Sequence, residues 1–287
     1  MKKIAGFILI VILLITGCSS QLKATKSKEW VPLQTLEIWH SVYYAGFYNE
    51  SIGITVGYHG ATYYTEDGGK AWTKGDNEAN CRYGLDFLDE KNLWTIGNYG
   101  GNRVSNDGGA TLSAVTDFEL IDNKPNQLLS IITKDTVWIA SPVNLGVTHD
   151  GGLTWEKISF PNGCVTIVGM AFFSELEGYL LSEEGILYKT VDAGVSWSEF
   201  SRLVPATGFK KTETPSVAIH QYNKDELVVV FLDKDNYNYS ALTSNGGETW
   251  SYNKIIDLMR ASPYISNDGS YLTTINVKGE LKLYKWE

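Results

Sequence analysis

Arginine is scarce in this chain: only four arginines occur among 287 residues, and acidic residues outnumber basic ones 33 to 24. With a formal charge of −9, the chain lacks the basic surface typical of nucleic-acid-binding proteins, so no nucleic-acid partner is expected. Proline is rare as well, with 7 residues, which excludes a collagen-like chain. Beyond residue 15 no long apolar run occurs, which excludes a multi-span membrane protein. A hydrophobic content of 43% excludes a disordered chain.

Aromatic residues and glycine, by contrast, are abundant. The chain contains 9 Trp, 17 Tyr, 10 Phe and 28 Gly. Aromatic side chains favour strands, and glycine supplies the turns that need a positive φ. The composition therefore predicts an all-β fold in which many short strands are joined by tight turns.

The N-terminal segment has the features of an export signal. Two lysines precede a twelve-residue apolar run from Ile4 to Ile15, which is shorter than the ~20 residues that span a bilayer. The sequence Ile15-Thr16-Gly17-Cys18 follows and resembles the bacterial lipobox, whose cysteine is diacylated after cleavage. We therefore expect a signal peptide at 1–17, lipidation at Cys18, a polar tether at 18–29 and an exported domain at 30–287. An ordinary secretory signal with an incidental cysteine is the alternative.

Lipidation would place the protein at the cell membrane or the outer membrane, with its domain outside the cytoplasm and the lipid anchor as its only contact with the membrane. Two further cysteines, Cys81 and Cys164, remain in the exported part. Export permits a disulfide between them, but their spacing carries no framework signature, so pairing stays open.

Five segments of the chain share one pattern, with Ser or Thr, then Asp or Asn two positions later, then a glycine and usually a tryptophan. The Asp or Asn positions are separated by 40, 43, 42 and 53 residues, which is the spacing of a repeat architecture. The segments are Thr65-Glu66-Asp67-Gly68-Gly69-Lys70-Ala71-Trp72, Ser105-Asn106-Asp107-Gly108-Gly109-Ala110-Thr111-Leu112, Thr148-His149-Asp150-Gly151-Gly152-Leu153-Thr154-Trp155, Thr190-Val191-Asp192-Ala193-Gly194-Val195-Ser196-Trp197 and Thr243-Ser244-Asn245-Gly246-Gly247-Glu248-Thr249-Trp250.

This pattern resembles the Asp-box of BNR-type β-propellers. The resemblance implies that each box is a hairpin turn between the third and fourth strands of a blade. Five equivalent copies indicate a structural role rather than an active site or a calcium site. The carboxylate would accept backbone N–H bonds within the turn, and the indole would pack on the sheet. The residues given this role are Asp67, Asp107, Asp150, Asp192, Asn245, Trp72, Trp155, Trp197 and Trp250.

Turns outside the boxes predict six four-stranded antiparallel blades. The sixth blade lacks a box, because the chain ends after its third strand at 281–286. Its fourth strand is expected from the N-terminal segment 28–33, with Trp30 in the place of a box tryptophan, so that the first and last blades are joined. Seven blades are the alternative, with the extra one in the 192–245 interval. The excess there is only about ten residues, which is more consistent with a loop at 202–214.

Over 30–287 the chain resembles BNR-repeat proteins of the photosystem II assembly and stability factor type. The resemblance implies a non-enzymatic factor that binds a protein partner, although the motif reports the scaffold better than the partner. A carbohydrate-binding or sialidase-like glycosidase propeller is the alternative. Sialidase chemistry needs three arginines around a carboxylate, and the four arginines here are not arranged in the family's pattern. The four histidines are dispersed, so neither a metal nor a cofactor is expected.

The binding surface of propellers is usually the end that carries the interblade loops and the turns between second and third strands. Aromatic and arginine side chains among polar groups at this end would suit protein or glycan recognition. The candidate binding residues are His40, Tyr58, His59, Arg82, Tyr83, Asn98 and Tyr99.

Overall fold

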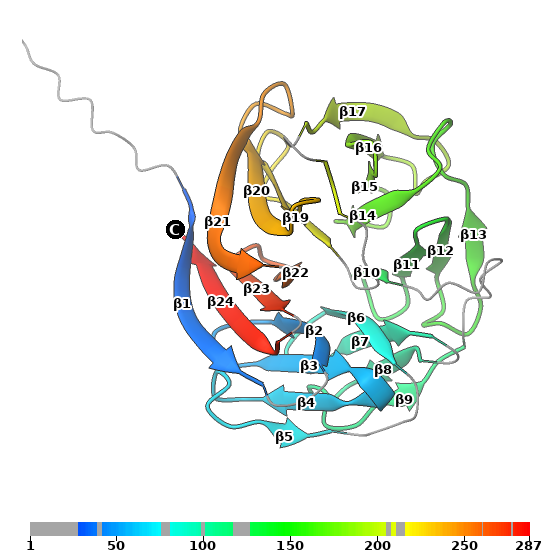
Figure 1. The fold of residues 1–287 in the computed structure, drawn as a ribbon. Helices are drawn as coiled ribbons and strands as arrows, with labels where there is room; N and C mark the ends of the chain where they lie inside the picture. Colours follow the sequence, from blue (N-terminus) through cyan, green and yellow to red (C-terminus); the bar gives the residue numbers. More distant parts are fainter. Residues whose placement is uncertain are drawn as a thin grey trace, which may run out of the picture.

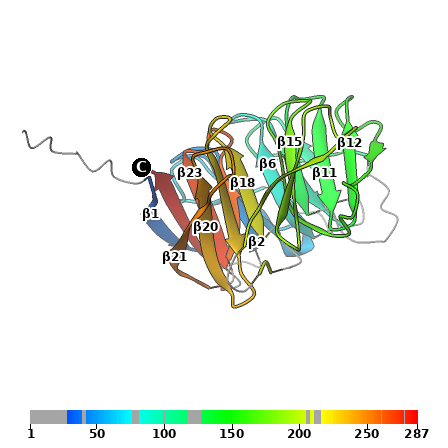
Figure 2. The ribbon, with the colours of Figure 1, turned by 90° about the horizontal axis from the view of Figure 1, so that it is seen from above.

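The computed structural model describes residues 28–38, 42–75, 81–98, 101–116, 127–204, 208–210, 216–259, 261–276 and 278–287, with the backbone alone at 256–259. These residues form six four-stranded antiparallel sheets arranged as blades around a central channel (Figure 1). The predicted all-β, six-bladed propeller is therefore confirmed. Figure 2 shows the ring from its edge, with the strands crossing its thickness.

Blades 1 to 3 follow one another along the chain. Blade 1 contains β2 (Val42–Phe47), β3 (Gly53–Gly57), β4 (Thr62–Thr65) and β5 (Thr73–Lys74). Blade 2 contains β6 (Arg82–Phe87), β7 (Leu93–Gly97), β8 (Arg103–Ser105) and β9 (Ser113–Ala114). Blade 3 contains β10 (Leu128–Ile131), β11 (Val137–Ser141), β12 (Asn144–Thr148) and β13 (Glu156–Ile158).

The remaining blades complete the ring. Blade 4 contains β14 (Ile167–Phe172), β15 (Gly178–Ser182), β16 (Ile186–Thr190) and β17 (Ser198–Arg202). Blade 5 contains β18 (Val217–Gln221), β19 (Leu227–Leu232), β20 (Tyr237–Thr243) and β21 (Ser251–Met259). Blade 6 contains β22 (Ala261–Ile265), β23 (Tyr271–Asn276), β24 (Glu280–Trp286) and the N-terminal strand β1 (Trp30–Glu37).

The N-terminal strand closes the ring as the sequence predicts. Strand β1 pairs antiparallel with β24 from Trp30 opposite Trp286 to Glu37 opposite Glu280, so it is longer than the expected segment 28–33. The two indoles lie 4.7 Å apart between ring centroids. Because the pairing covers the outer edge of β24, no three-stranded blade is left open.

The seven-blade alternative is wrong, because the structure forms six four-stranded sheets and the described residues of the 192–245 interval contribute only β17 to β20 and the connection between β17 and β18. Within that connection Phe209 is buried and its ring lies 4.9 Å from the ring of Phe231 on β19. An isolated bridge pairs Phe209 with Asp233. The segment therefore packs against blade 5 rather than forming a sheet of its own.

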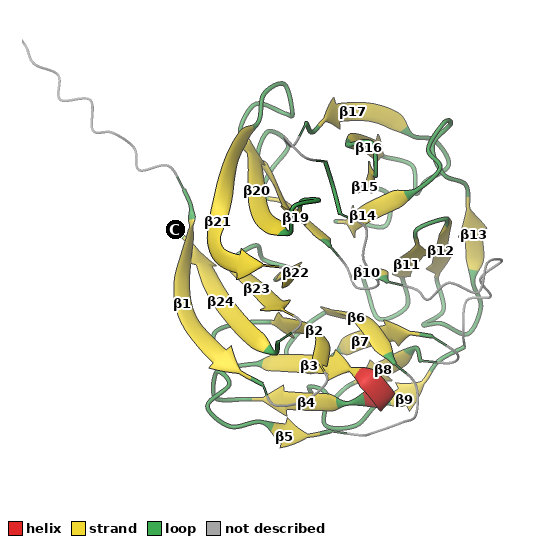
Figure 3. Cartoon of the chain, in the orientation of Figure 1, coloured by secondary structure: helices red, strands yellow, loops and turns green. Residues whose placement is uncertain are grey.

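The hydrophobic core is divided among the interfaces between blades. Among the described residues six clusters of buried side chains occur; each joins neighbouring blades, and the cluster between blades 1 and 2 also includes Tyr264 of blade 6. The second strands are buried along their whole length except at Tyr271, for example Leu227–Leu232, because both faces of each blade pack against a neighbour. The fourth strands at the rim are mostly exposed. The described residues contain one short helical turn, at Tyr58–Gly60, and no helix long and apolar enough to cross a membrane (Figure 3).

Candidate functional site

Two inner strands have a tyrosine as their second residue, and a β-bulge sets this tyrosine apart from the ladder. The pairing register shifts between Val42 and Tyr44 in β2 and between Arg82 and Gly84 in β6, so Tyr43 and Tyr83 are the extra residues. A bulge redirects the side chain it carries. The Tyr43 and Tyr83 rings stack with 5.6 Å between centroids and an interplanar angle of 4°, which joins blades 1 and 2 at this end of the ring.

The turn between β3 and β4 adds two more rings to this stack. Tyr58 is 45% exposed and its ring lies 6.3 Å from that of Tyr43 and 3.9 Å from the imidazole of His59. His59 has a φ of 50°, a left-handed conformation that is uncommon outside glycine. We call Tyr43, Tyr58, His59 and Tyr83 the aromatic group.

Arg82 holds this turn in place and is not a surface residue. The sequence predicts an exposed binding residue, but the side chain is fully buried. Its Nη1 donates to the carbonyl of Gly60 at 2.6 Å and to Oγ1 of Thr62 at 3.0 Å. The guanidinium enters the interface between blades 1 and 2 because buried carbonyl and hydroxyl acceptors lie there. Arg82 therefore positions Tyr58 and His59 from below.

The other candidate residues are distributed as follows. Asn98 is half-buried, and its backbone N–H donates to the carbonyl of Cys81 at 3.2 Å, beside the start of β6. His40 and Tyr99 lie outside the described residues. The structure thus brings Tyr58, His59 and Tyr83 together. Sequence reasoning missed Tyr43, although the shared Val-Tyr and Arg-Tyr strand starts could have indicated it.

The five repeat turns have one hydrogen-bond pattern. In blade 3, Oδ1 of Asp150 accepts the backbone N–H of Thr154 at 2.9 Å, and Oγ1 of Thr148 accepts the backbone N–H of Gly152 at 2.9 Å. The Thr148 hydroxyl donates to Asp150 at 2.8 Å. The same carboxylate or amide oxygen accepts the N–H four residues later in the other turns, at Asp67, Asp107, Asp192 and Asn245.

These hydrogen bonds keep the turn carboxylates ionised. The hydroxyl of Thr154, followed by its backbone N–H, lowers the pKa of Asp150 to about 2. Gly152 has a φ of 87°, and a Cβ there would lie 2.7 Å from the Trp94 ring of the preceding blade. The turn therefore requires glycine both for its backbone conformation and for its packing. The oxygens of Asp150 accept hydrogen bonds from Thr148 and Thr154 of the same turn, so the carboxylate stabilises the turn and is not free for catalysis.

The turn tryptophans are half-buried and fix the outer strands. Trp155 donates through Nε1 to the carbonyl of Thr116 at 2.8 Å and meets Trp94 edge-to-face at 6.2 Å. Trp250 donates to Oγ of Ser201 at 2.9 Å, which links blades 5 and 4. Trp72 contacts Phe47 edge-to-face, and Trp197 contacts Phe172 in the same way.

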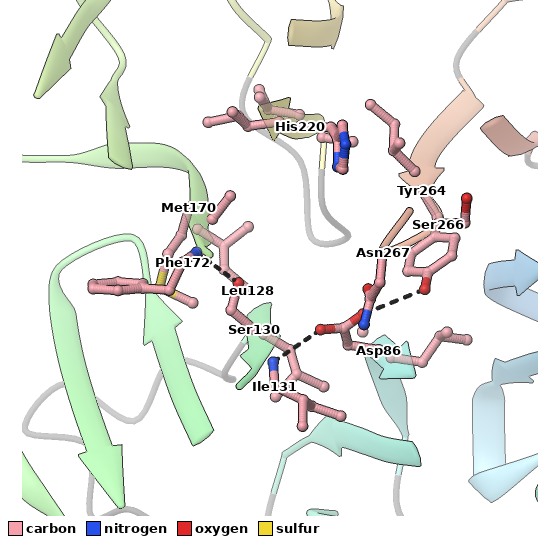
Figure 4. A pocket seen from close by; sticks show the side chains of 18 of the residues that line it. Asp86, Leu128, Ser130, Ile131, Met170, Phe172, His220, Tyr264, Ser266 and Asn267 are labelled. Atoms are coloured by element: carbon pink, nitrogen blue, oxygen red, sulfur yellow. Dashed lines mark hydrogen bonds between the residues drawn. The ribbon is translucent and has the colours of Figure 1, made fainter. Parts of the chain in front are cut away.

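A ring of six equivalent side-chain positions surrounds the channel farther from the aromatic group. Each is the penultimate residue of an inner strand, roughly 10 Å along the strand from the bulge positions. We call this set the channel ring; it consists of Gly46, Asp86, Ser130, Ala171, His220 and Tyr264. All except Gly46 line a cavity of about 220 Å³ (Figure 4). No single repeat motif marks these positions, so sequence reasoning missed them.

Asp86 joins three blades across the channel ring. Its Oδ1 accepts the backbone N–H of Phe87 at 2.9 Å and lies 3.3 Å from the donating hydroxyl of Tyr264. Its Oδ2 accepts the backbone N–H of Ile131 at 2.9 Å. Burial raises the pKa of Asp86 to about 7, although these hydrogen bonds act in the opposite direction.

Glycine at the first ring position makes the Tyr264 contact with Asp86 possible. A Cβ at Gly46 would lie 2.9 Å from the Tyr264 ring, so the small residue lets that ring pass blade 1 and reach blade 2. On the opposite side of the cavity, burial lowers the pKa of His220 to about 4, which leaves the imidazole neutral. The cavity therefore contains one carboxyl group and one neutral imidazole facing each other.

The described part of the chain contains no candidate metal site, no disulfide and no group of converging arginines. No group of three or more His, Cys, Asp or Glu side chains there could hold a metal ion. Cys81 and Cys164 are free thiols. Arg82 and Arg103 are buried in blade 2, whereas Arg202 lies on the outer strand of blade 4, so these three guanidinium groups do not converge.

Comparison with known proteins identifies the fold but no family. No known family's sequence profile matches the chain, and none of the curated proteins does. Similar solved structures include YCF48 bound to a D1 peptide, which is 14% identical with a TM-score of 0.52 and 90% of this chain and 100% of that chain covered. YCF48 from Cyanidioschyzon merolae is 14% identical with a TM-score of 0.55 and coverage of 90% and 98%.

An ancestral GH74 enzyme is similar as well, at 16% identity and a TM-score of 0.57, but only 39% of its length is covered by 90% of this chain. At these identities the likeness reports the architecture rather than the activity. The chain is thus a six-bladed β-propeller whose structural neighbours include both peptide-bound and enzymatic proteins.

Proposed function

We propose that this chain is a lipid-anchored, extracytoplasmic propeller that binds a protein partner through the aromatic group, without catalysis. The observation that carries the proposal is the aromatic group itself. Two bulges and a left-handed turn gather four rings where blades 1 and 2 meet, and Arg82 fixes the turn from within the interface. Partly exposed, rigid aromatic side chains are typical anchors of protein interfaces, because they offer a large contact area at a small entropic cost.

Two further observations support this proposal. YCF48, which shares the architecture over 90% of this chain, has been solved with a bound peptide. The N-terminal sequence through Cys18 has the order of a lipoprotein signal, which would hold the domain close to membrane-associated partners. The family resemblance of the five repeat turns points to assembly or stability factors of the same kind.

Glycan binding is the second candidate, because stacked tyrosines also suit sugar rings and a GH74 enzyme shares the architecture. Hydrolysis is less well supported than binding. Inverting and retaining glycosidases use a pair of carboxyl groups, whereas Asp86 is the one carboxyl group among the described residues that line the channel cavity.

The proposal is tested by crosslinking in intact membranes followed by capture of the full chain. Tyr58→Ala combined with Tyr83→Ala should reduce partner capture at least about tenfold, the loss of roughly 1.4 kcal/mol or more expected from removing an interface anchor. The matched control is Leu153→Ala combined with Val195→Ala, which truncates two exposed side chains in the repeat turns at the other end. Equal capture by the tyrosine variant would refute the assignment. Binding of glycans in an array, lost in the same variant, would favour the second candidate.

A further inference from the structure

The carboxyl group of Asp86 carries a charge that the link between blades 2 and 3 does not require. Asp86 and Ser130 occupy the same place in neighbouring blades, opposite Trp94 and Trp138. Ser130 Oγ accepts the backbone N–H of Phe172 at 3.1 Å, just as Asp86 Oδ2 accepts that of the next blade. A hydroxyl is therefore sufficient for this link between blades. The second oxygen, Oδ1, accepts the Phe87 N–H and the Tyr264 hydroxyl, and neither of these neutral donors compensates a full negative charge.

No cation compensates this charge among the described residues that line the cavity. Neither lysine nor arginine occurs in that lining, and the one histidine, His220, is neutral. A buried carboxylate is costly unless it is paired, so without a partner the group takes up a proton instead. The raised pKa of Asp86 reflects this situation. A ligand that brings its own positive charge would remove the cost.

The cavity has the size and the acceptors for such a ligand. Its volume is about 220 Å³. About seven water molecules occupy this volume in the liquid, at roughly 30 Å³ each, so a short alkyl chain with a charged end fits. Asp86 Oδ2 keeps a lone pair beyond its single hydrogen bond. His220 and the Ser130 hydroxyl face the same space (Figure 4). Tyr44 and Tyr264 add aromatic rings, which attract cations.

We propose that the central channel binds a primary ammonium group, with Asp86 as its counter-ion. An ammonium brings a positive charge for the carboxylate and three N–H donors, for which the carboxylate, the Ser130 hydroxyl and the neutral imidazole are the acceptors in the lining. The group can be carried by a small free amine or by a lysine side chain of a bound protein. The first source does not depend on the partner-binding proposal, so the two proposals can fail separately.

The pH dependence of binding distinguishes this site from a merely apolar cavity. The titratable groups facing Asp86 are Tyr44 on β2, His220 on β18 and Tyr264 on β22. Burial raises the pKa of both tyrosines far above neutrality and lowers that of His220 to about 4, so all three stay neutral between pH 6 and 8. With its pKa at about 7, Asp86 alone ionises in this range, and ammonium binding should strengthen about tenfold from pH 6 to pH 8.

The test is calorimetric titration of the full chain, purified in detergent, with n-butylamine and with its neutral analogue n-butanol. Wild type should bind the amine and discriminate against the alcohol at least about tenfold at pH 8. Asp86→Ser, which places the side chain of Ser130 in blade 2, should still unfold in one cooperative transition and lose at least about tenfold in amine affinity. Asp135→Ser removes an exposed carboxylate outside the channel and should leave the affinity unchanged.

A third probe, N-acetyl-lysine methylamide, distinguishes a lysine side chain from a small free amine as the source of the ammonium group. Binding of this probe in competition with n-butylamine identifies a lysine side chain as a competent ligand, whereas binding of n-butylamine alone identifies a small free amine. Both results uphold the site. Equal amine affinity in wild type and Asp86→Ser, equal affinity for amine and alcohol, or an affinity independent of pH between 6 and 8 overturns it. So does the absence of binding by either amine.

Discussion

Replacing Arg82 by methionine should destabilise the domain without removing a direct binding contact. Methionine keeps much of the apolar stem but lacks the donor that satisfies the Gly60 carbonyl and the Thr62 hydroxyl. Hydrogen bonds from a charged donor contribute about 1.5–3 kcal/mol each. The Gly60 carbonyl keeps the Thr62 hydroxyl as a donor at 3.0 Å, so it is not left unpaired. Because the two bonds share one nitrogen, we expect a loss of about 2–4 kcal/mol in the free energy of unfolding.

Urea unfolding followed by tryptophan fluorescence measures this loss, with Arg202→Met as the matched control. The Arg202 side chain is half exposed on β17, so its replacement should change the free energy of unfolding by no more than about 0.5 kcal/mol. If Arg82→Met unfolded at the same urea concentration as wild type yet lost partner capture, the buried, supporting role of Arg82 would be refuted. Arg82 would then have to contact the partner directly.

Three further predictions concern the turns, the channel and the anchor. Thr148→Val should cost about 1–3 kcal/mol in urea unfolding, because the buried N–H of Gly152 loses its acceptor; an unchanged stability would contradict the role of the turn hydroxyl. Asp86 ionises near pH 3.8 when unfolded and at about 7 when folded, so the stability of wild type relative to Asp86→Ser should fall as pH rises from 4 to 8, by up to about 4 kcal/mol; a rise or a flat difference would contradict the raised pKa. Cys18→Ser should release the chain from the membrane fraction or leave it unprocessed, and a variant that is processed and membrane-bound like wild type would contradict lipidation.

The blade number and the closure of the ring could be predicted from sequence because they depend on local signals. Each repeat turn is built from hydrogen bonds within about four residues, such as Asp150 to Thr154, so its residues recur wherever the turn recurs. Counting turns then gives the number of blades, and the missing fourth strand of the last blade leaves one place for the N-terminal segment. The extension of β1 to Glu37 was not predictable, because it depends on pairing with a strand about 250 residues away.

The sites between blades were harder to predict, because they depend on how neighbouring sheets face each other. Arg82 begins a strand, and its position alone does not show that its acceptors lie 20 to 22 residues earlier in blade 1. Asp86 belongs to a ring whose other members are Gly, Ser, Ala, His and Tyr, so no shared residue type marks the position. Aligning the ends of the six inner strands would have exposed Asp86 as the one charged carboxyl group among them.

Photocrosslinking in living cells shows directly whether a protein partner binds at the aromatic group. A photoreactive benzoylphenylalanine is introduced at Tyr58, which is 45% exposed at the proposed binding end, or at Val195, which is 85% exposed in a repeat turn at the other end. We expect a discrete crosslinked protein from position 58 that is absent from position 195. A crosslink from position 195 with none from position 58 would refute binding at the aromatic group.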